Sequence, residues 1–287
     1  MINWPAYLIK DIARRRCVIF LGAGVSRNCT NQQGRRPKTW EEFLRDSAAQ
    51  VQPNRHVLRL IRQADYLTAC EVLRIALGRD PFAQLLRDEF MSPRYQHAPI
   101  HEHIFRLDSR IVATPNFDKI YETYANHQAG ASIIVKHHYD PDVSDALRDD
   151  GRLILKIHGS IDSPNRMVFT RSEYAEARNK FRSFYEILDA LAITHTFVFI
   201  GCGVNDPDLK LLLEDVFFRH PASRTHFMVL PRGATHNSIG AIIENTMNLK
   251  ILLYSKVNNH AELTDSLDTL ATDVEVQRDD LRQTGNW

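Results

Sequence analysis

The chain alternates between short apolar runs and longer segments in which apolar residues recur with helical spacing. Residues 4–16 carry Leu8, Ile9 and Ile12 on one side of a predicted helix, and the arginines at its end suit the helix dipole. The next five residues, 17–21, form the continuous apolar run CVIFL. Such a run indicates a strand that is buried on both faces of a parallel sheet.

Further apolar runs predict additional strands, with helical segments between several of them. These runs cover residues 111–114, 132–135, 153–157, 196–200, 226–230 and 249–253. Strands that alternate with helices are typical of an α/β protein with parallel strands. The sequence therefore predicts a Rossmann-like α/β fold with a doubly wound, mostly parallel sheet.

Between the first two predicted strands, residues 39–110 show mainly helical patterns. Thr39 is placed to cap a helix that carries Trp40 and Phe43, and further helices are predicted over 65–78, 81–90 and 97–107. We interpret this stretch as a small helical module inserted into one domain of residues 1–274. Its large apolar side chains are expected mainly in the core, with an interface as the alternative. Residues 275–287 turn polar and predict a frayed tail.

Composition narrows the function classes and the compartment. Hydrophobic residues make up 44% of the 287 residues, and 36 Lys and Arg balance 35 Asp and Glu. Direct nucleic-acid binding is therefore not expected. The four cysteines form no C-x-x-C pair, and the N-terminal apolar run is too short for a signal or a membrane span. We expect a reduced, cytoplasmic protein without membrane association.

Distinctive polar and glycine-rich loops follow four of the apolar runs. In an open parallel sheet, the loops at the carboxyl ends of the strands converge on the ligand. The four loops therefore predict one pocket at one edge of the sheet. They are Gly22-Ala23-Gly24-Val25-Ser26-Arg27, Thr114-Pro115-Asn116-Phe117-Asp118, Lys156-Ile157-His158-Gly159-Ser160 and Gly201-Cys202-Gly203-Val204-Asn205-Asp206.

The first loop has the chemistry of a phosphate site. Glycine lacks a Cβ, so backbone N–H groups can approach a pyrophosphate at the start of a helix. Arg27 stands where a third glycine of G-x-G-x-x-G would be, and no strand-end acid follows ~20 residues later, which disfavours an ordinary dehydrogenase. A tight strand-to-helix turn without a ligand remains the alternative for this loop.

The second and third loops supply candidate catalytic groups. The near-neutral pKa typical of histidine suits His158 for proton transfer. The Asn116 amide could position a water or a ribose hydroxyl, and the Asp118 carboxylate could orient a ring or a loop. A single histidine at a strand end is more often structural, but its placement with Asn116 favours catalysis. We expect Asn116 and His158 on surface loops, outside the core.

These motifs, in this order, resemble those of the sirtuin family over residues 15–255. The family pattern runs G-A-G-x-S, T-x-N-x-D, H-G-S after a strand, and a G-[TCY]-[SG] loop after an apolar strand. The resemblance implies that Asn116 and His158 are catalytic and that Asp118 supports the nicotinamide and ribose end. It implies NAD binding by Gly22, Ala23, Gly24, Ser26, Arg27, Thr114, Gly201, Cys202, Gly203 and Asp206.

Departures from the family pattern point to one branch of it. Protein-deacylating sirtuins continue with G-I-P-D-F-R and usually carry two C-x-x-C pairs for zinc, and both features are missing here. The chain is more similar to the zinc-less sirtuin-like proteins of bacterial antiphage defence. That similarity implies an NAD glycohydrolase that yields nicotinamide and ADP-ribose and acts by NAD depletion, without a metal. A protein deacylase and a non-catalytic module that senses NAD or ADP-ribose remain the alternatives.

Control of such an enzyme leads to an expectation about partners. An unregulated NAD hydrolase would drain its own cell, and the sequence contains no recognisable sensor domain. We therefore expect a homo-oligomer and a separate regulatory partner, with a HerA-type ATPase as one candidate.

Three other clusters are given less weight. His97, His101 and His103 include an i, i+4 pair, but no third type of metal ligand accompanies them. Residues 137–140 are interpreted as a polar loop. Cys202 between two glycines invites a nucleophile assignment, but close approach of the backbone to a cofactor is preferred.

Overall fold

The strands of the protein form a single parallel sheet. The computed structural model describes residues 1–204, 212–213, 218–220 and 223–285. The order of its seven strands is β3-β4-β2-β1-β5-β6-β7, and each neighbouring pair is parallel. The predicted Rossmann-like α/β fold is confirmed. The strands are β1 (Cys17–Leu21), β2 (Ile111–Thr114), β3 (Ile134–His137), β4 (Leu153–Lys156), β5 (Thr196–Ile200), β6 (His226–Pro231) and β7 (Leu249–Tyr254).

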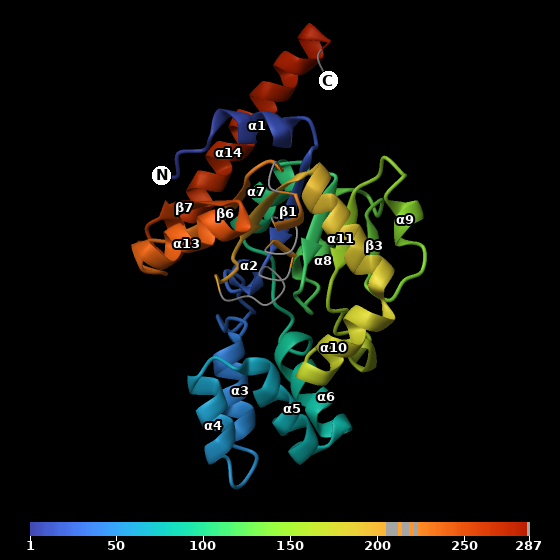
Figure 1. Ribbon diagram of the computed structural model, residues 1–287, viewed down its shortest axis with the longest axis vertical. Helices are drawn as coiled ribbons and strands as arrows, with labels where there is room; N and C mark the ends of the chain where they lie inside the picture. Colours follow the sequence, from blue (N-terminus) through green and yellow to red (C-terminus); the bar gives the residue numbers. More distant parts are fainter. Residues whose placement is uncertain (205–211, 214–217, 221–222, 286–287) are drawn as a thin grey trace.

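Helices cover both faces of the sheet (Figure 1). The central strands β1 and β5 are buried along their whole length, which explains why their sequences are continuously apolar. One face packs on α1 (Ala6–Ala13), α7 (Pro99–Arg106), α8 (Ile120–Gln128) and α14 (Val257–Thr284). The other face packs on α9 (Val143–Ala146), α10 (Arg171–Lys180), α11 (Arg182–Thr194) and α13 (Asn237–Met247).

Four helices between β1 and β2 form a separate cluster at one end of the molecule, below the sheet in Figure 1. They are α3 (Trp40–Ala48), α4 (Arg55–Arg62), α5 (Tyr66–Leu77) and α6 (Arg79–Phe90). Thr39 caps α3 in a capping box with Glu42, as predicted. Trp40 and Phe43 pack within this cluster and against Phe169. The segment expected over 39–110 therefore divides, since α7 packs on the sheet with α14.

The prediction of a frayed tail after residue 274 was wrong as far as Thr284. Residues 275–284 continue α14, where Leu281 is 2% exposed and Arg278 is 6% exposed. The Arg278 guanidinium donates hydrogen bonds to the carbonyl oxygens of Ile12, Ala13 and Leu107. It thus satisfies the carbonyls at the ends of α1 and α7. Because Arg278 is charged, the sequence suggested an exposed segment, although this part of α14 packs against α1 and α7.

The strand order reverses between β1 and β5. The chain passes from β1 to β2 on one side and returns after β4 to form β5 on the other side of β1. Loops that leave the two strands at such a switch point separate and create a ligand crevice. The Gly22 and Gly201 loops start there.

Two further properties bear on the expected compartment. None of the described helices is long and apolar enough to cross a membrane. Cys17, Cys29, Cys70 and Cys202 are buried and form no disulfide within the described residues.

Candidate functional site

The loops after β1 and β5 pack directly against each other. The N–H of Gly22 donates to the Ile200 carbonyl and the N–H of Gly24 donates to the Gly201 carbonyl, both at 2.9 Å. A Cβ on Gly22 would lie 2.5 Å from the Gly201 oxygen, and one on Gly24 would lie 2.9 Å from the same atom. Gly201 itself has φ +71°. The glycines are therefore needed for contact between the two backbones, a reason that differs from the predicted approach of a phosphate.

Some of the predicted NAD-binding residues in these two loops are exposed. Ala23, Gly24 and Gly203 are exposed, so these positions remain accessible to a ligand. The Gly22 and Gly24 amides are already engaged by protein carbonyls. Asp206 lies outside the described residues.

Hydrogen bonds join the Gly22 loop to the loop after β2. The Ser26 hydroxyl donates to Asp118 Oδ2 at 2.7 Å. The Asn116 amide nitrogen donates to the Gly22 carbonyl at 3.0 Å and to Ser26 Oγ at 3.2 Å. Thr114 supports the same turn, because its hydroxyl donates to the Leu21 carbonyl and accepts from the Asn116 N–H. The structure thus brings five of the predicted site residues together, namely Gly22, Ser26, Thr114, Asn116 and Asp118.

This network fixes the orientation of the Asn116 amide. The Gly22 carbonyl can only accept, so the NH₂ end of the amide must face it. The single Ser26 hydroxyl proton goes to Asp118, so Ser26 accepts the second amide hydrogen. Both N–H groups are then used, and Asn116 Oδ1 is the atom that remains to accept a hydrogen bond from a water or a hydroxyl.

A buried ion pair lies beneath the loop after β2. Lys156, the last residue of β4, is 1% exposed, and its Nζ lies 3.1 Å from Glu122 Oε2 and donates to the Asp118 carbonyl at 2.6 Å. It ties β4, and with it the His158 loop, to the Asp118 loop. The predicted third loop already included Lys156, but neither its burial nor its pairing with Glu122 was predicted. A lysine within the apolar run LILKI was the signal that could have found them.

The prediction that His158 lies on the surface was wrong. The side chain is 6% exposed, and its ring packs edge-on against Tyr174 with centroids 5.4 Å apart. Phe117 connects it to the Asn116 loop, with ring centroids 6.3 Å apart. Its loop is tight because Gly159 has φ +83° and a Cβ there would lie 2.9 Å from the Arg166 carbonyl oxygen. His158 is thus a buried residue at the strand end, while Asn116 is half-buried.

Comparison with known proteins places this geometry in a family. Residues 110–252 match the model of the SIR2-like domain. The chain carries a SIR2-like domain. The matched range includes the Asn116, His158 and Gly201 loops.

Several curated relatives agree with this assignment. The chain is 25% identical over 237 residues to an NAD(+) hydrolase ThsA of Enterococcus faecium, which covers 79% of this chain and 46% of that protein. It is 21% identical to ThsA of Bacillus cereus, over 93% of this chain and 56% of the relative. Defense-associated sirtuin 2 of Bacillus subtilis is 24% identical over 52% of this chain and 15% of its own length. The chain spans about half the length of the ThsA relatives it matches.

Two predicted NAD-binding residues of the SIR2-like protein are turned toward other protein groups. The Arg27 guanidinium pairs with Glu42 at 2.5 Å and donates to the Pro37 carbonyl at 2.6 Å, which ties the first loop to the start of α3. Cys202 is 7% exposed and packs beneath Gly22, where its Sγ would lie 2.8 Å from a Cβ on that glycine. In this conformation Arg27 and Cys202 support the loops.

The histidines of the 97–103 segment point to separate partners. His97 stacks on Tyr124 with centroids 4.3 Å apart, and His103 lies 3.3 Å from Asp268. His101 is fully buried, and its Nε2 lies 3.6 Å from Cys29 Sγ. No group of three or more potential metal ligands occurs in the described part of this SIR2-like protein.

Proposed function

We propose that this chain hydrolyses NAD to nicotinamide and ADP-ribose, and that it acts as an antiphage effector by depleting NAD. The observation that carries this proposal is the fixed Asn116 amide, held by Gly22 and Ser26 with its oxygen left to accept a hydrogen bond. The SIR2-like match and the relatives named NAD(+) hydrolase support it.

The chemistry assigns one role to each candidate residue. The bond between ribose C1′ and the nicotinamide nitrogen breaks, and its electron pair leaves with nicotinamide. The transition state resembles an oxocarbenium ion, so a positioned water must attack C1′. Asn116 Oδ1 would orient this water, and His158 would take its proton or that of a ribose hydroxyl. Asp118 would act through Ser26, which holds the amide of Asn116.

The remaining predicted contacts are with the dinucleotide. We assign its phosphates to the exposed backbone at Ala23 and Gly24, beside Ser26 and Thr114, and its adenosine half to the Gly201 loop. These contacts need no metal. Arg27 could join them only by leaving Glu42.

Incubation of the purified protein with NAD tests the proposal, with products separated by chromatography. Nicotinamide and ADP-ribose should form in equal amounts without any peptide. Product that appears only with an acetylated peptide would indicate the deacylase, and binding without product would indicate a sensing module. Either outcome would refute NAD hydrolysis as the activity.

We further propose that the chain forms a homo-oligomer. Support comes from exposed apolar residues beside the edge strand β7, where Ile242 is 60% exposed, Ile239 50% and Leu253 41%. Trp40 and Phe43, the earlier candidates for an interface, pack inside their own cluster. Light scattering after size-exclusion chromatography should give a mass above 33.1 kDa, and Ile242→Asp should lower it. A wild-type monomer would contradict this proposal.

A separate regulatory partner, such as a HerA-type ATPase, stays a prediction. It follows from the need to restrain an enzyme that consumes NAD. NAD turnover measured with and without such an ATPase tests it, and full activity of the chain alone would refute it.

A further inference from the structure

A cavity at the edge of the sheet lies away from the Asn116 network. It has a volume of about 510 Å³ and opens at the carboxyl ends of β3 and β4. Its wall consists of residues 138–139 after β3, residues 165–168 after β4 and one side of α10, with Arg79 from α6. The lining residues include none from the 22–27 or 114–118 loops. The cavity is therefore a different place from the proposed NAD site.

Positive side chains dominate the charge of this cavity. Arg79, Arg166 and Lys180 line it, and none of the three forms an ion pair with a described carboxylate. Of the two acids in the wall, Glu173 is paired with Arg74 and accepts the N–H groups of Phe169 and Thr170. Glu176 remains as the opposing charge. The cavity thus has more cations than acids, and these cations have no carboxylate partner among the described residues, although Arg166 packs on the Tyr139 ring and Lys180 on the Phe181 ring.

A buried histidine also lines the cavity. His138 is 3% exposed, and its Nδ1 makes no hydrogen bond within the described residues. Phe181 and Tyr139 pack against the ring with centroids 5.0 Å away. Burial and the nearby His158 lower the pKa of His138 to about 4, so the ring is neutral at physiological pH. His138 lies in the turn after β3, within the polar loop predicted over residues 137–140, but its burial was not predicted. Buried polar atoms normally have a partner, and one that lacks it indicates a place for a ligand or a water.

We propose that this cavity binds a phosphorylated small molecule as a second ligand. Arg79, Arg166 and Lys180 would contact its phosphate groups, because arginine presents paired N–H donors to phosphate oxygens and lysine adds a point charge. The volume lies within the range of roughly 300–1,000 Å³ that is usual for small-molecule sites. This site is additional to the proposed NAD hydrolysis.

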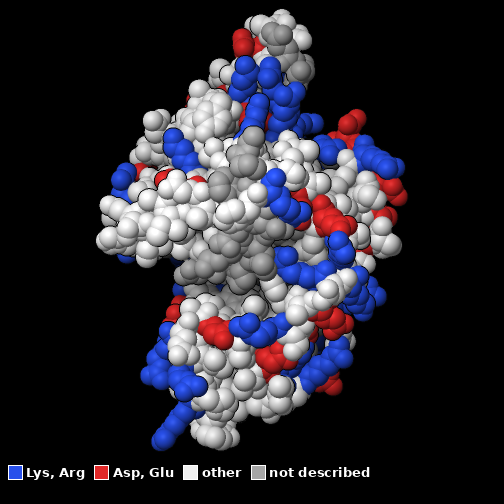
Figure 2. Space-filling view, in the orientation of Figure 1, with Lys and Arg blue, Asp and Glu red and all other residues white. Residues whose placement is uncertain are grey.

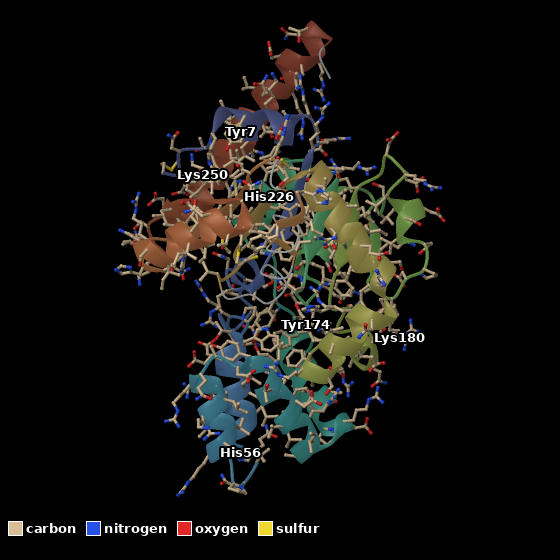
Figure 3. All side chains as sticks on the ribbon, in the orientation of Figure 1. Tyr7, His56, Tyr174, Lys180, His226 and Lys250 are labelled. Carbon is tan, nitrogen blue, oxygen red and sulfur yellow. The ribbon has the colours of Figure 1, made fainter. Side chains whose placement is uncertain are left out.

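The cavity wall contacts His158, so a ligand there would act on the catalytic region. Val168, in the wall, donates its N–H to the His158 carbonyl at 3.0 Å. Tyr174, which packs on the His158 ring, lies on α10 between wall residues Glu173 and Ala177. Figure 3 shows Tyr174 on the inner side of α10 and Lys180 at the outer edge of the molecule. On the outer surface around α10, basic and acidic side chains lie close together (Figure 2).

Calorimetry with inorganic pyrophosphate tests the site directly and needs no NAD turnover. The wild-type protein should bind pyrophosphate, and the double variant Arg166→Ala, Lys180→Ala should bind at least tenfold more weakly. The control is Arg148→Ala, Arg182→Ala, which removes the same charge from side chains that are 83% and 80% exposed outside the cavity. Thermal unfolding should show that both double variants are folded.

Three outcomes would overturn the proposal. The first is that pyrophosphate does not bind the wild type, and the second is that the cavity and control variants weaken binding equally. If the cavity variant instead raises the KM for NAD by the same factor as the Kd for pyrophosphate, the cavity belongs to the NAD site. The binding measurement does not depend on hydrolase activity. Failure of the proposed NAD hydrolysis can therefore be distinguished from failure of the proposed second site.

Discussion

At the ends of β1, β2 and β5 the loops bond to one another, whereas at the ends of β3 and β4 they leave a cavity. In the first region, Gly24 bonds to Gly201, and Ser26 holds both Asn116 and Asp118. In the second region, Arg166 and Lys180 carry charge that no described carboxylate neutralises. Both regions lie at the same edge of one sheet.

The difference fits the role proposed for each region. A catalytic group must be held in place before the substrate arrives, so its hydrogen bonds are made within the protein. A binding site gains more from groups whose partner is the ligand itself. Lys156 joins the two regions, since it ends β4 and bonds to the Asp118 carbonyl.

The largest expected effect comes from removing the fixed amide. Asn116→Ala should reduce NAD cleavage by ~10²- to 10⁴-fold, because the attacking water loses its positioning group. The side chain is half-buried, so the protein should remain folded. Asn179→Ala, which removes an exposed amide on α10, is the matched control. Near wild-type turnover in Asn116→Ala would contradict the catalytic assignment. His158→Ala is a weaker test, since it also removes a buried ring.

The next largest effect is expected from breaking the ion pair of Lys156, which connects the two regions. Lys156→Met should lower the free energy of unfolding by roughly 3–5 kcal/mol, because Glu122 is left buried without its partner. Adding Glu122→Leu should recover part of the loss. Urea denaturation measures both variants. If the single and the double variant are equally unstable, the ion pair does not explain the effect.

The free energy of unfolding should fall at acid pH, because each region contains a buried neutral histidine. Burial is the main cause that lowers the pKa of His101, near Asn116, and of His138, in the cavity, each to about 4. The unfolded chain binds more protons than the folded chain between about pH 6.5 and 4, so acid destabilises the fold by up to about 3 kcal/mol per histidine. Denaturation at several pH values should show a smaller decline in His138→Leu. An unchanged decline would remove His138 as a cause.

A smaller effect on stability is expected for substitution of Gly24, but not of Gly203, in the first region. Gly24→Ala should cost roughly 1–3 kcal/mol of stability, because the added Cβ would lie 2.9 Å from the Gly201 backbone. Gly203→Ala is the control, since no described atom lies within 4 Å of a Cβ there. Thermal unfolding should show a lower Tm only for the first variant. Equal Tm values would mean that the two loops can separate at little cost.

These regions also show what the sequence could predict. The strands were predictable because β1 and β5 are continuously apolar, and parallel strands bring their terminal loops to one edge. The Asn116 and Asp118 loop was found by its motif. Its hydrogen bonds with Gly22 and Ser26 were not predicted, because they depend on tertiary structure.

Buried charge explains the other failures. Arg278 and Lys156 were not identified as core residues, since burial of a charge depends on partners distant in the sequence. The burial of His138 was not predicted either, because it depends on Phe181 and Phe184, which are distant in the sequence. Sequence patterns thus indicated which loops lie together at the sheet edge, but not the buried charged groups that support them.

The smallest expected effect is that of a chelator. Neither region brings three potential metal ligands together within the described residues, and His97, His101 and His103 contact Tyr124, Cys29 and Asp268 separately. EDTA should therefore leave NAD cleavage and the Tm unchanged, because hydrogen bonds within the protein already organise the Asn116 region. The test needs dialysis against EDTA, followed by assays with and without added zinc. A loss of activity that zinc restores would contradict this prediction, and it would return the histidine segment to the list of functional candidates.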